Sequence, residues 1–328
     1  MDFLQTRRDK TESRLQTLKK KLNKAEEVAR GKACVYLTGS YGRGEASNHS
    51  DLDLFIVGRG TKDSRDLTKL DEILIKANLI EATRELKFQE FSGDGEYLNH
   101  YTVDDLVDTL GTQDDDKTNT FTARLLLLLE SRPLLEKEVY LDLTSKVIDA
   151  YWGDFKGHEK KFLPAFLVND ILRLWRTFCV NYEARTKKKN ETDDQKANRK
   201  LKNYKLKHSR LLTCYSALVY LIAVMDERGT VSQNDAKHMV SLSPTERLEW
   251  LKSQTKFGNK AGQIDAIISL YRTFLKRTDS PKDKLIEIFK DPKNSEEVFQ
   301  EAKEFGDQVY DLLWSIGKDN KVFRILVV

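Results

Sequence analysis

The feature that most constrains this 328-residue sequence is a glycine-rich turn between two apolar segments, the second of which begins with two aspartates. Residues 33–38 read ACVYLT, a β-rich run that ends at Gly39, and residues 51–57 read DLDLFIV. Side chains alternate along a strand, so Asp51 and Asp53 are predicted to share one face, about 7 Å apart. Two such carboxylates repel each other and gain nothing in a core, but a shared cation makes the pair favourable.

This pattern predicts a divalent-metal and phosphate site. Mg²⁺, or Mn²⁺ in its place, takes oxygen ligands and keeps room for water and substrate phosphates. Gly39 lets the backbone come close to a ligand, and Ser40 offers an amide and a hydroxyl to phosphate oxygens. Asp-x-Asp alone would favour a tight turn followed by a solvent-facing strand with exposed carboxylates. The combination with the Gly-Ser turn favours the metal site.

The stretch GSYGRGEASNHSDLDLFIV resembles the signature of the DNA polymerase β-like nucleotidyltransferase superfamily. It is most similar to the catalytic segment of the bacterial PII uridylyltransferases. The resemblance is specific over residues 36–57 and extends weakly to about residue 135, where TARLLLLLESRPLL resembles a helix that follows the catalytic core. It implies an enzyme that uses an NTP, with Asp51 and Asp53 as catalytic metal ligands. No further uridylyltransferase feature follows, so PII uridylylation is not implied.

The resemblance also implies a third carboxylate from a later strand, which would bind metal and draw a proton from the attacking hydroxyl. We expect this strand over residues 86–95, LKFQEFSGDG. Glu90 is the favoured third catalytic and metal-binding residue, and Asp94 is the alternative. Relatives more often place an aspartate between apolar residues, a pattern from which Gln89-Glu90-Phe91 departs.

Arg43 and Glu45 lie within the phosphate turn. The guanidinium fork of Arg43 matches phosphate oxygens well and is predicted to bind nucleotide. A surface ion pair between Arg43 and Glu45 is the alternative.

A second set of cations lies in an apolar helix, FLVNDILRLWRTFCVNYEAR, at residues 166–185. Arginines in so apolar a helix need partners. Arg173 and Arg176 are therefore expected either to pair with Asp170 and Glu183 or to reach the triphosphate or acceptor, with Arg173 the better candidate for nucleotide binding.

A lysine-rich stretch, residues 185–207, is expected to form a mobile loop or a solvated helix, with binding of an acidic partner as an open role. It leads into KLKHSR at residues 205–210. In the wider superfamily a lysine or serine of the helical domain often touches the triphosphate. By that analogy Lys205, Lys207 and Ser209 are candidate phosphate contacts.

The order of these patterns predicts an α+β fold with two domains. Residues 1–140 mix helices and strands and would form the nucleotidyltransferase core, with helices over 3–30 and 64–78. Residues 141–328 are almost wholly helical and would form a second domain.

Composition excludes several classes. The longest apolar runs fall far short of the roughly 20 residues that a membrane span needs, and the N-terminus has no apolar segment typical of a secretory signal. Three cysteines without C-x-x-C spacing argue against a disulfide framework or a structural zinc site. We expect a cytoplasmic protein that does not associate with a membrane.

The acceptor cannot be read from these patterns. A protein side chain, an RNA end, a small molecule and a second nucleotide all remain open, and the last would resemble the cyclic-oligonucleotide synthases of bacterial defence. A catalytically inactive nucleotide-binding module is a further alternative, against which the intact aspartate pair argues.

Overall fold

The chain folds into two compact units, Met1–Gly153 and Asp154–Val328. The computed structural model describes residues 2–61, 63–89, 91, 98, 100–187 and 191–327. The predicted α+β class is confirmed, because the described strands all belong to the first unit. The predicted boundary at 140/141 falls inside helix α8, Lys137–Tyr151, which packs on strand β1, Ala33–Leu37. The division therefore falls after this helix and not within it.

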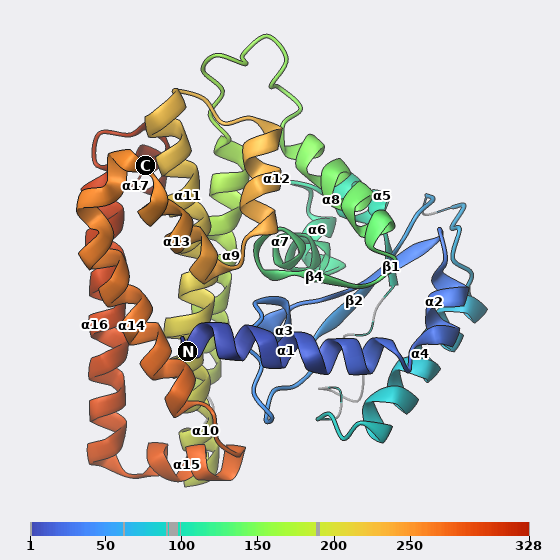
Figure 1. Ribbon diagram of the computed structural model, residues 1–328, viewed down its shortest axis with the longest axis horizontal. Helices are drawn as coiled ribbons and strands as arrows, with labels where there is room; N and C mark the ends of the chain where they lie inside the picture. The colour runs from blue at the N-terminus through green and yellow to red at the C-terminus, as the bar shows by residue number, and fades with distance from the viewer. Residues whose placement is uncertain are drawn as a thin grey trace. The chain divides into compact units, whose positions relative to one another are not determined.

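The first unit contains helices and strands in mixed order (Figure 1). Its helices are α1 Phe3–Lys19, α2 Asn23–Ala29, α3 Gly39–Gly42, α4 Lys69–Glu85, α5 Val103–Asp108, α6 Asp114–Lys117, α7 Thr120–Glu130 and α8 Lys137–Tyr151. Its strands are β1 Ala33–Leu37, β2 Leu54–Gly58, β3 His100–Thr102 and β4 Arg132–Leu135.

The four strands form one mixed sheet in the order β3-β2-β1-β4. The central pair β1–β2 is antiparallel, with Leu37 opposite Leu54, and β4 is antiparallel to β1. Strand β3 runs parallel to β2. Pro133 lies on the edge strand β4, where the lack of an amide donor costs least.

The two faces of the sheet carry different cores, because side chains alternate along each strand. Val35 and Leu37 of β1 pack with apolar residues of α1, α2 and α4. On the other face Tyr36 stacks on Phe55 and donates a hydrogen bond from its hydroxyl to the carbonyl of Ala123 in α7. The sheet is thus covered by α1, α2 and α4 on one side and by α7 and α8 on the other.

Three predicted elements of this unit differ in the structure. The expected helix over 3–30 is two helices, α1 and α2, and the helix expected at 64–78 runs from Lys69 to Glu85, where Thr68 forms its capping box. The strand expected over 86–95 is wrong for its described N-terminal part, because Leu86–Gln89 lie in a turn and an irregular segment after α4. The remaining positions of that segment are outside the described residues, except Phe91, which is also irregular.

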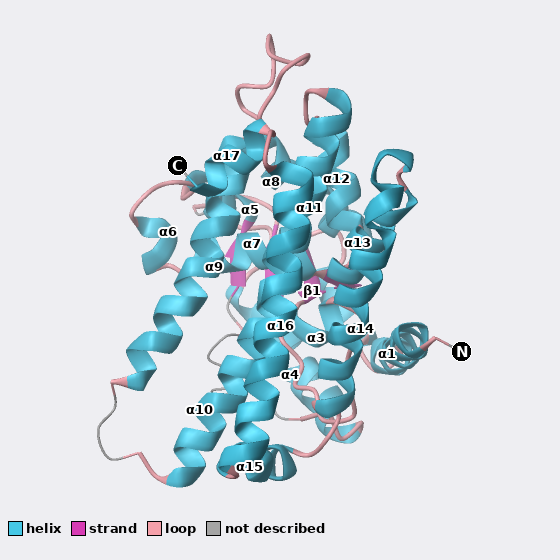
Figure 2. Ribbon diagram, turned by 90° about the vertical axis from the view of Figure 1, so that its left-hand side faces the viewer, coloured by secondary structure: helices cyan, strands magenta, loops and turns pink. Residues whose placement is uncertain are grey.

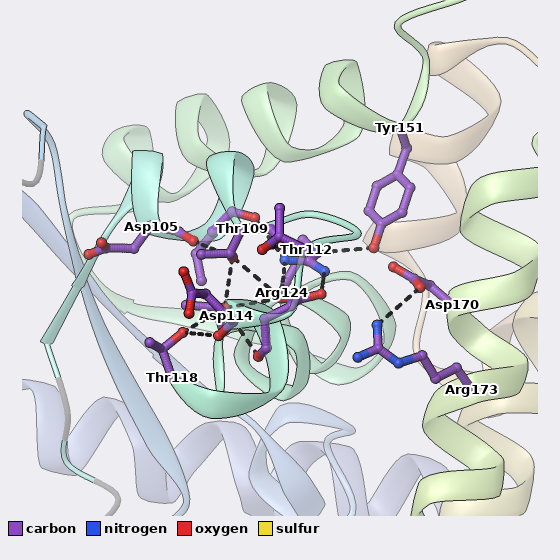
Figure 3. A network of polar contacts seen from close by, with 12 residues as sticks. Asp105, Thr109, Thr112, Asp114, Thr118, Arg124, Tyr151, Asp170 and Arg173 are labelled. Carbon is purple, nitrogen blue, oxygen red and sulfur yellow. Dashed lines mark hydrogen bonds and ion pairs between the residues drawn. The ribbon is translucent and has the colours of Figure 1, made fainter.

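A buried arginine connects the helices on the α7 side of the sheet (Figure 3). Arg124 of α7 is fully buried and forms two hydrogen bonds with Asp115 of α6, at 2.9 and 2.6 Å. Its other donors bond the carbonyl of Leu106 in α5 and the hydroxyl of Tyr151 in α8. A guanidinium this buried is tolerable only with such complete pairing. The network fixes four helices around one charge.

The regular elements among the described residues of the second unit are all helices, joined by loops and turns (Figure 2). Its elements are α9 Ala165–Thr186, α10 Asp193–Lys205, the π-helix η2 Leu206–Arg210, α11 Leu211–Arg228, α12 Gln233–Ser241, α13 Pro244–Ser253, the 3₁₀ helix η3 Thr255–Lys260, α14 Ala261–Arg277, α15 Lys282–Lys290, α16 Pro292–Gly317 and α17 Lys321–Val327. Helix α11 is the central element and packs against α9, α13, α16 and α17.

The lysine-rich stretch is helical for most of its described length. Residues 193–205 form α10, so the solvated-helix alternative is the correct one there and the loop alternative is wrong. Its apolar side, with Ala197, Leu201 and Tyr204, is buried, and α10 packs on α15. The lysines occupy the remaining, polar side of this helix.

One described stretch, Asp193–Arg228, is long and apolar enough to cross a membrane by length and composition. Its apolar window is 83% buried inside the protein. A buried core helix passes the same test, so this stretch does not support a membrane span.

Candidate active site

The glycine turn and the aspartate segment meet at Gly39 and Asp53. The amide of Thr38 donates a hydrogen bond to the carbonyl of Asp53 at 2.9 Å, which extends the β1–β2 ladder past its last pair. Gly39 has φ +62°, and a β-carbon built on it would lie 2.8 Å from the Asp53 carboxylate oxygen Oδ2. The glycine thus permits both the left-handed backbone and the close approach of the carboxylate.

The two aspartates alternate in burial with their neighbouring leucines, and the strand predicted over residues 51–57 begins later than expected. Leu52 and Leu54 are buried at 2% and 3% exposure, whereas Asp51 is exposed and Asp53 is half-buried. Both aspartates precede β2, which begins at Leu54. They therefore lie just before the N-terminal end of the strand, where the core of the sheet no longer covers their side chains.

The turn itself is one short helical segment, α3, that begins at Gly39. Ser40 is half-buried, and its hydroxyl has no hydrogen-bond partner among the described residues. Tyr41 is fully buried, and this burial, opposed by the nearby Arg14 and reinforced by the charge of Asp51, raises the pKa of its hydroxyl to about 12. The phenol is therefore neutral at physiological pH.

Arg43 is held by two carboxylates. Its Nε donates to Glu45 Oε2 at 2.8 Å and its Nη1 donates to Glu130 Oε2 at 2.7 Å. Arg43 is only 6% exposed. The predicted alternative, an Arg43–Glu45 pair, is present in a buried form. Binding of phosphate by Arg43 has no support in this geometry and stays a prediction.

Helix α1 holds the turn from a second direction, which sequence reasoning missed. Thr11 accepts a hydrogen bond from the amide of Ala46, and Arg14 Nη1 donates to the carbonyl of Ser47 at 2.7 Å. The Arg14 guanidinium also lies 5.6 Å from the ring centre of Tyr41. The polar stripe of α1 gave no signal of this contact, because a loop partner 33 residues away leaves no periodic pattern.

A Gly-Ser turn thus lies against an Asp-x-Asp segment at the end of a strand. Residues 15–109 match the family model of the nucleotidyltransferase domain. The match includes the turn, both aspartates and the sheet strands β1, β2 and β3. It supports membership of this domain in the nucleotidyltransferase superfamily without distinguishing a subfamily. No curated protein matches the chain.

The third carboxylate of the nucleotidyltransferase domain remains a prediction. Glu90 and Asp94 both lie outside the described residues. Within the described part of the chain, no group of three or more His, Cys, Asp or Glu side chains could hold a metal ion. Asp51 and Asp53 are thus the candidate metal ligands that lie within the described residues.

Asp51 and Asp53 fit a divalent cation by their chemistry and their surroundings. Both are carboxylates, the ligand type that Mg²⁺ prefers. Oxygen Oδ2 of Asp53 borders the space that a side chain at residue 39 would fill. Neither aspartate side chain is buried in the apolar core that the neighbouring leucines join.

The predicted nucleotide-binding residues of the helical unit are in α9, α10 and η2. Arg173 pairs with Asp170 of its own helix at 3.8 Å (Figure 3). Arg176 and Glu183 are exposed. The Asp170–Arg173 part of the predicted pairing is confirmed. The Arg173 side chain is still 33% exposed, so a nucleotide role for it stays a prediction.

Lys205, Lys207 and Ser209 lie where α10 passes into the π-helix η2. Lys205 and Lys207 are exposed, and the Lys207 ammonium lies 5.6 Å from the ring centre of Phe299. Ser209 is buried and donates its hydroxyl to the carbonyl of Lys205 at 2.9 Å. This internal bond occupies the Ser209 proton, and phosphate binding by these three residues remains a prediction.

Proposed function

We propose that this protein is a metal-dependent nucleotidyltransferase that moves an NMP from an NTP to an acceptor and releases pyrophosphate. The observation that carries the proposal is the contact of the Asp53 carboxylate with Gly39, in a segment that matches the nucleotidyltransferase domain. A carboxylate beside a glycine turn that can hold phosphate would bring metal ligand and triphosphate together.

In this mechanism Asp51 and Asp53 would hold Mg²⁺ or Mn²⁺ just before the N-terminal end of β2. The bound cation would neutralise triphosphate charge and promote ionisation of the attacking group. Ser40 is half-buried, with its hydroxyl available to a phosphate oxygen. A third carboxylate, Glu90 or Asp94, would accept the acceptor's proton as general base. The turn and the aspartates together orient the α-phosphorus for in-line attack.

For the acceptor we propose an RNA end. Residues 185–210 contain eleven lysines and arginines against three aspartates and glutamates, although the whole chain has a net charge of only +4. In α10 and η2 the side chains of Lys196, Lys202, Lys205 and Lys207 are exposed. A concentrated positive charge of this kind favours a polyanionic partner. A protein side chain, a small molecule and a second nucleotide are the competing acceptors.

The test is incubation with each of the four α-³²P-labelled NTPs and Mg²⁺, with and without whole-cell RNA and protein. Label on RNA that decreases as salt rises would support the RNA acceptor. Label on protein, or in a small product, would replace RNA by a protein, a small molecule or a second nucleotide, the last as in a cyclic-oligonucleotide synthase.

A catalytically inactive nucleotide-binding module is the alternative from another class. It would bind NTP without releasing pyrophosphate from any of the four NTPs under any acceptor condition. Metal-dependent pyrophosphate release by the wild type, lost in Asp53→Asn, would exclude this alternative.

A further inference from the structure

The glycine turn rests on a part of the chain beyond the matched nucleotidyltransferase segment. Glu130 is the last residue of α7, and Arg132 is the first of β4. A β-carbon on Gly42 would lie 2.0 Å from the Glu130 carbonyl oxygen, and one on Gly44 would lie 2.7 Å from Arg132 Nη2. The glycines thus allow the turn to lie directly on the junction between α7 and β4.

Glu130 joins the two ends of the turn with its two carboxylate oxygens. Its Oε1 accepts a hydrogen bond from the amide of Gly39 at 3.2 Å, and its Oε2 accepts one from Arg43 Nη1 at 2.7 Å. Its side chain is fully buried, and Glu130 as a whole is 3% exposed. Arg43 extends the network to Glu45, so one buried carboxylate fixes the first residue of the turn and the arginine that follows its last residue.

Gly39 therefore contributes to the site through its missing side chain and not through its amide. Its amide is bonded to Glu130 and is therefore not a free donor for a phosphate oxygen, whereas its missing side chain admits Asp53. A buried carboxylate is costly unless it is paired, and such groups can fix one conformation among several. The hydrogen bond from the Gly39 amide to Glu130 favours one conformation of the turn. In this conformation Gly39 lies against the Asp53 carboxylate, with the half-buried Ser40 next to it in the turn.

We propose that Glu130 is a positioning residue that fixes the nucleotide turn, through the Gly39 amide and the Arg43 guanidinium. Its role in nucleotide binding rests on the proposed nucleotidyltransferase function. Its role in fixing the turn does not, because the contacts stand without a nucleotide.

The test compares Glu130→Leu, Glu130→Gln and the control Glu136→Gln. The glutamine variant of Glu130 loses the charge that pairs with Arg43 but keeps a carbonyl for the Gly39 amide, whereas the leucine variant loses both. Glu136 is the matched control, because its Oε2 also accepts a glycine amide across the sheet, that of Gly31 at 2.8 Å, away from the turn. Circular dichroism establishes that each variant is folded.

Amide hydrogen exchange of the peptide spanning residues 38–45 is measured first, without nucleotide. We expect about tenfold faster exchange in Glu130→Leu, about threefold in Glu130→Gln and no change in Glu136→Gln. Unchanged exchange in the folded Glu130 variants would overturn the proposal. If leucine prevents folding, the glutamine variant decides alone by the same criterion.

Mg²⁺-NTP affinity by calorimetry is the second readout. We expect a Kd about tenfold weaker in Glu130→Leu, a smaller loss in Glu130→Gln and wild-type affinity in Glu136→Gln. A wild-type Kd in Glu130→Leu would overturn the link to nucleotide binding. If the wild-type protein itself binds no NTP and releases no pyrophosphate, the proposed function fails, while the exchange experiment still decides whether Glu130 fixes the turn.

Discussion

The Asp53 carboxylate and the α-carbon of Gly39 approach so closely that no side chain fits between them. A β-carbon at Gly39 would lie 2.8 Å from Asp53 Oδ2. This single contact joins the turn after β1 to the segment before β2, two elements already paired by the backbone bond from Thr38 to Asp53. It makes the position of the Asp53 carboxylate, the proposed metal ligand, depend on the absence of a side chain in the neighbouring turn.

Replacement of this glycine should therefore damage activity more than stability. Gly39→Ala adds a β-carbon against Asp53 and places alanine at φ +62°, with a conformational cost of about 1–2 kcal/mol. We expect kcat/KM to fall about a hundredfold, because a small displacement of catalytic groups has effects of that size. Pyrophosphate release and thermal melting are the measurements.

Gly31→Ala is the control for this substitution. Gly31 has a similar φ of +67°, but no atom lies within 4 Å of a β-carbon built there. It should lose comparable stability and keep its activity. Equal activity losses in the two variants would show that backbone strain alone, without Asp53, explains the effect.

The aspartates should be required for catalysis and dispensable for folding. Asp51→Asn and Asp53→Asn each remove a ligand charge at the end of β2, and we expect the rate to fall about a thousandfold or more with magnesium. The melting temperature should change little, since neither side chain belongs to the apolar core. Asp149→Asn, an exposed position on α8, should behave as wild type. Near-native activity in either site variant would refute the metal assignment.

Substitutions of Arg173 and Arg176 in α9 test whether these charges stabilise the fold or bind nucleotide. Arg173→Met removes one ionic partner of Asp170, whose side chain is 7% exposed, and we expect a loss of about 1 kcal/mol. That corresponds to a melting temperature lowered by about 2–4 °C with activity per folded molecule intact. Arg176→Met, at an exposed position of the same helix, should change neither. A large activity loss in Arg173→Met without a stability loss would instead place Arg173 in the nucleotide site.

Acid should destabilise the helical unit through His208 of the π-helix η2. Burial lowers the pKa of His208 from 6.5 to about 4, opposed in part by the Tyr204 carbonyl, and its ring lies 4.5 Å from that of Phe274. A depressed folded pKa means that the unfolded chain binds the proton first. Stability is therefore complete above pH 6.5 and decreases toward pH 4, by about 3 kcal/mol for this group.

His208→Phe removes the titrating group and keeps an aromatic ring in the stack. Its melting temperature should depend less on pH between about 7 and 4 than that of the wild type, measured by circular dichroism or calorimetry at constant ionic strength. Parallel pH profiles for the two proteins would show that His208 does not titrate in this range on unfolding.

Several features of the fold follow from the sequence alone. The alternation Leu52-Asp53-Leu54 predicts that the two leucines are buried and the aspartate is not, and the structure agrees although strand β2 begins only at Leu54. The Gly-Ser turn and Asp-Leu-Asp also predict the nucleotidyltransferase resemblance, and both lie in the segment that matches the nucleotidyltransferase domain model. The apolar periodicity likewise predicts the long helices of the second half.

Only the tertiary structure decides what surrounds the turn. Arg43 looks like a phosphate ligand in sequence, yet in the fold it is buried between Glu45 and Glu130, a residue 87 positions away. The sequence does not predict strand β4, because the strand contains Pro133 and directly follows an apolar helix. It forms because the open edge of β1 supplies backbone hydrogen-bond partners. Such contacts depend on which distant backbone atoms come within hydrogen-bond reach, and no local pattern of residues encodes that distance.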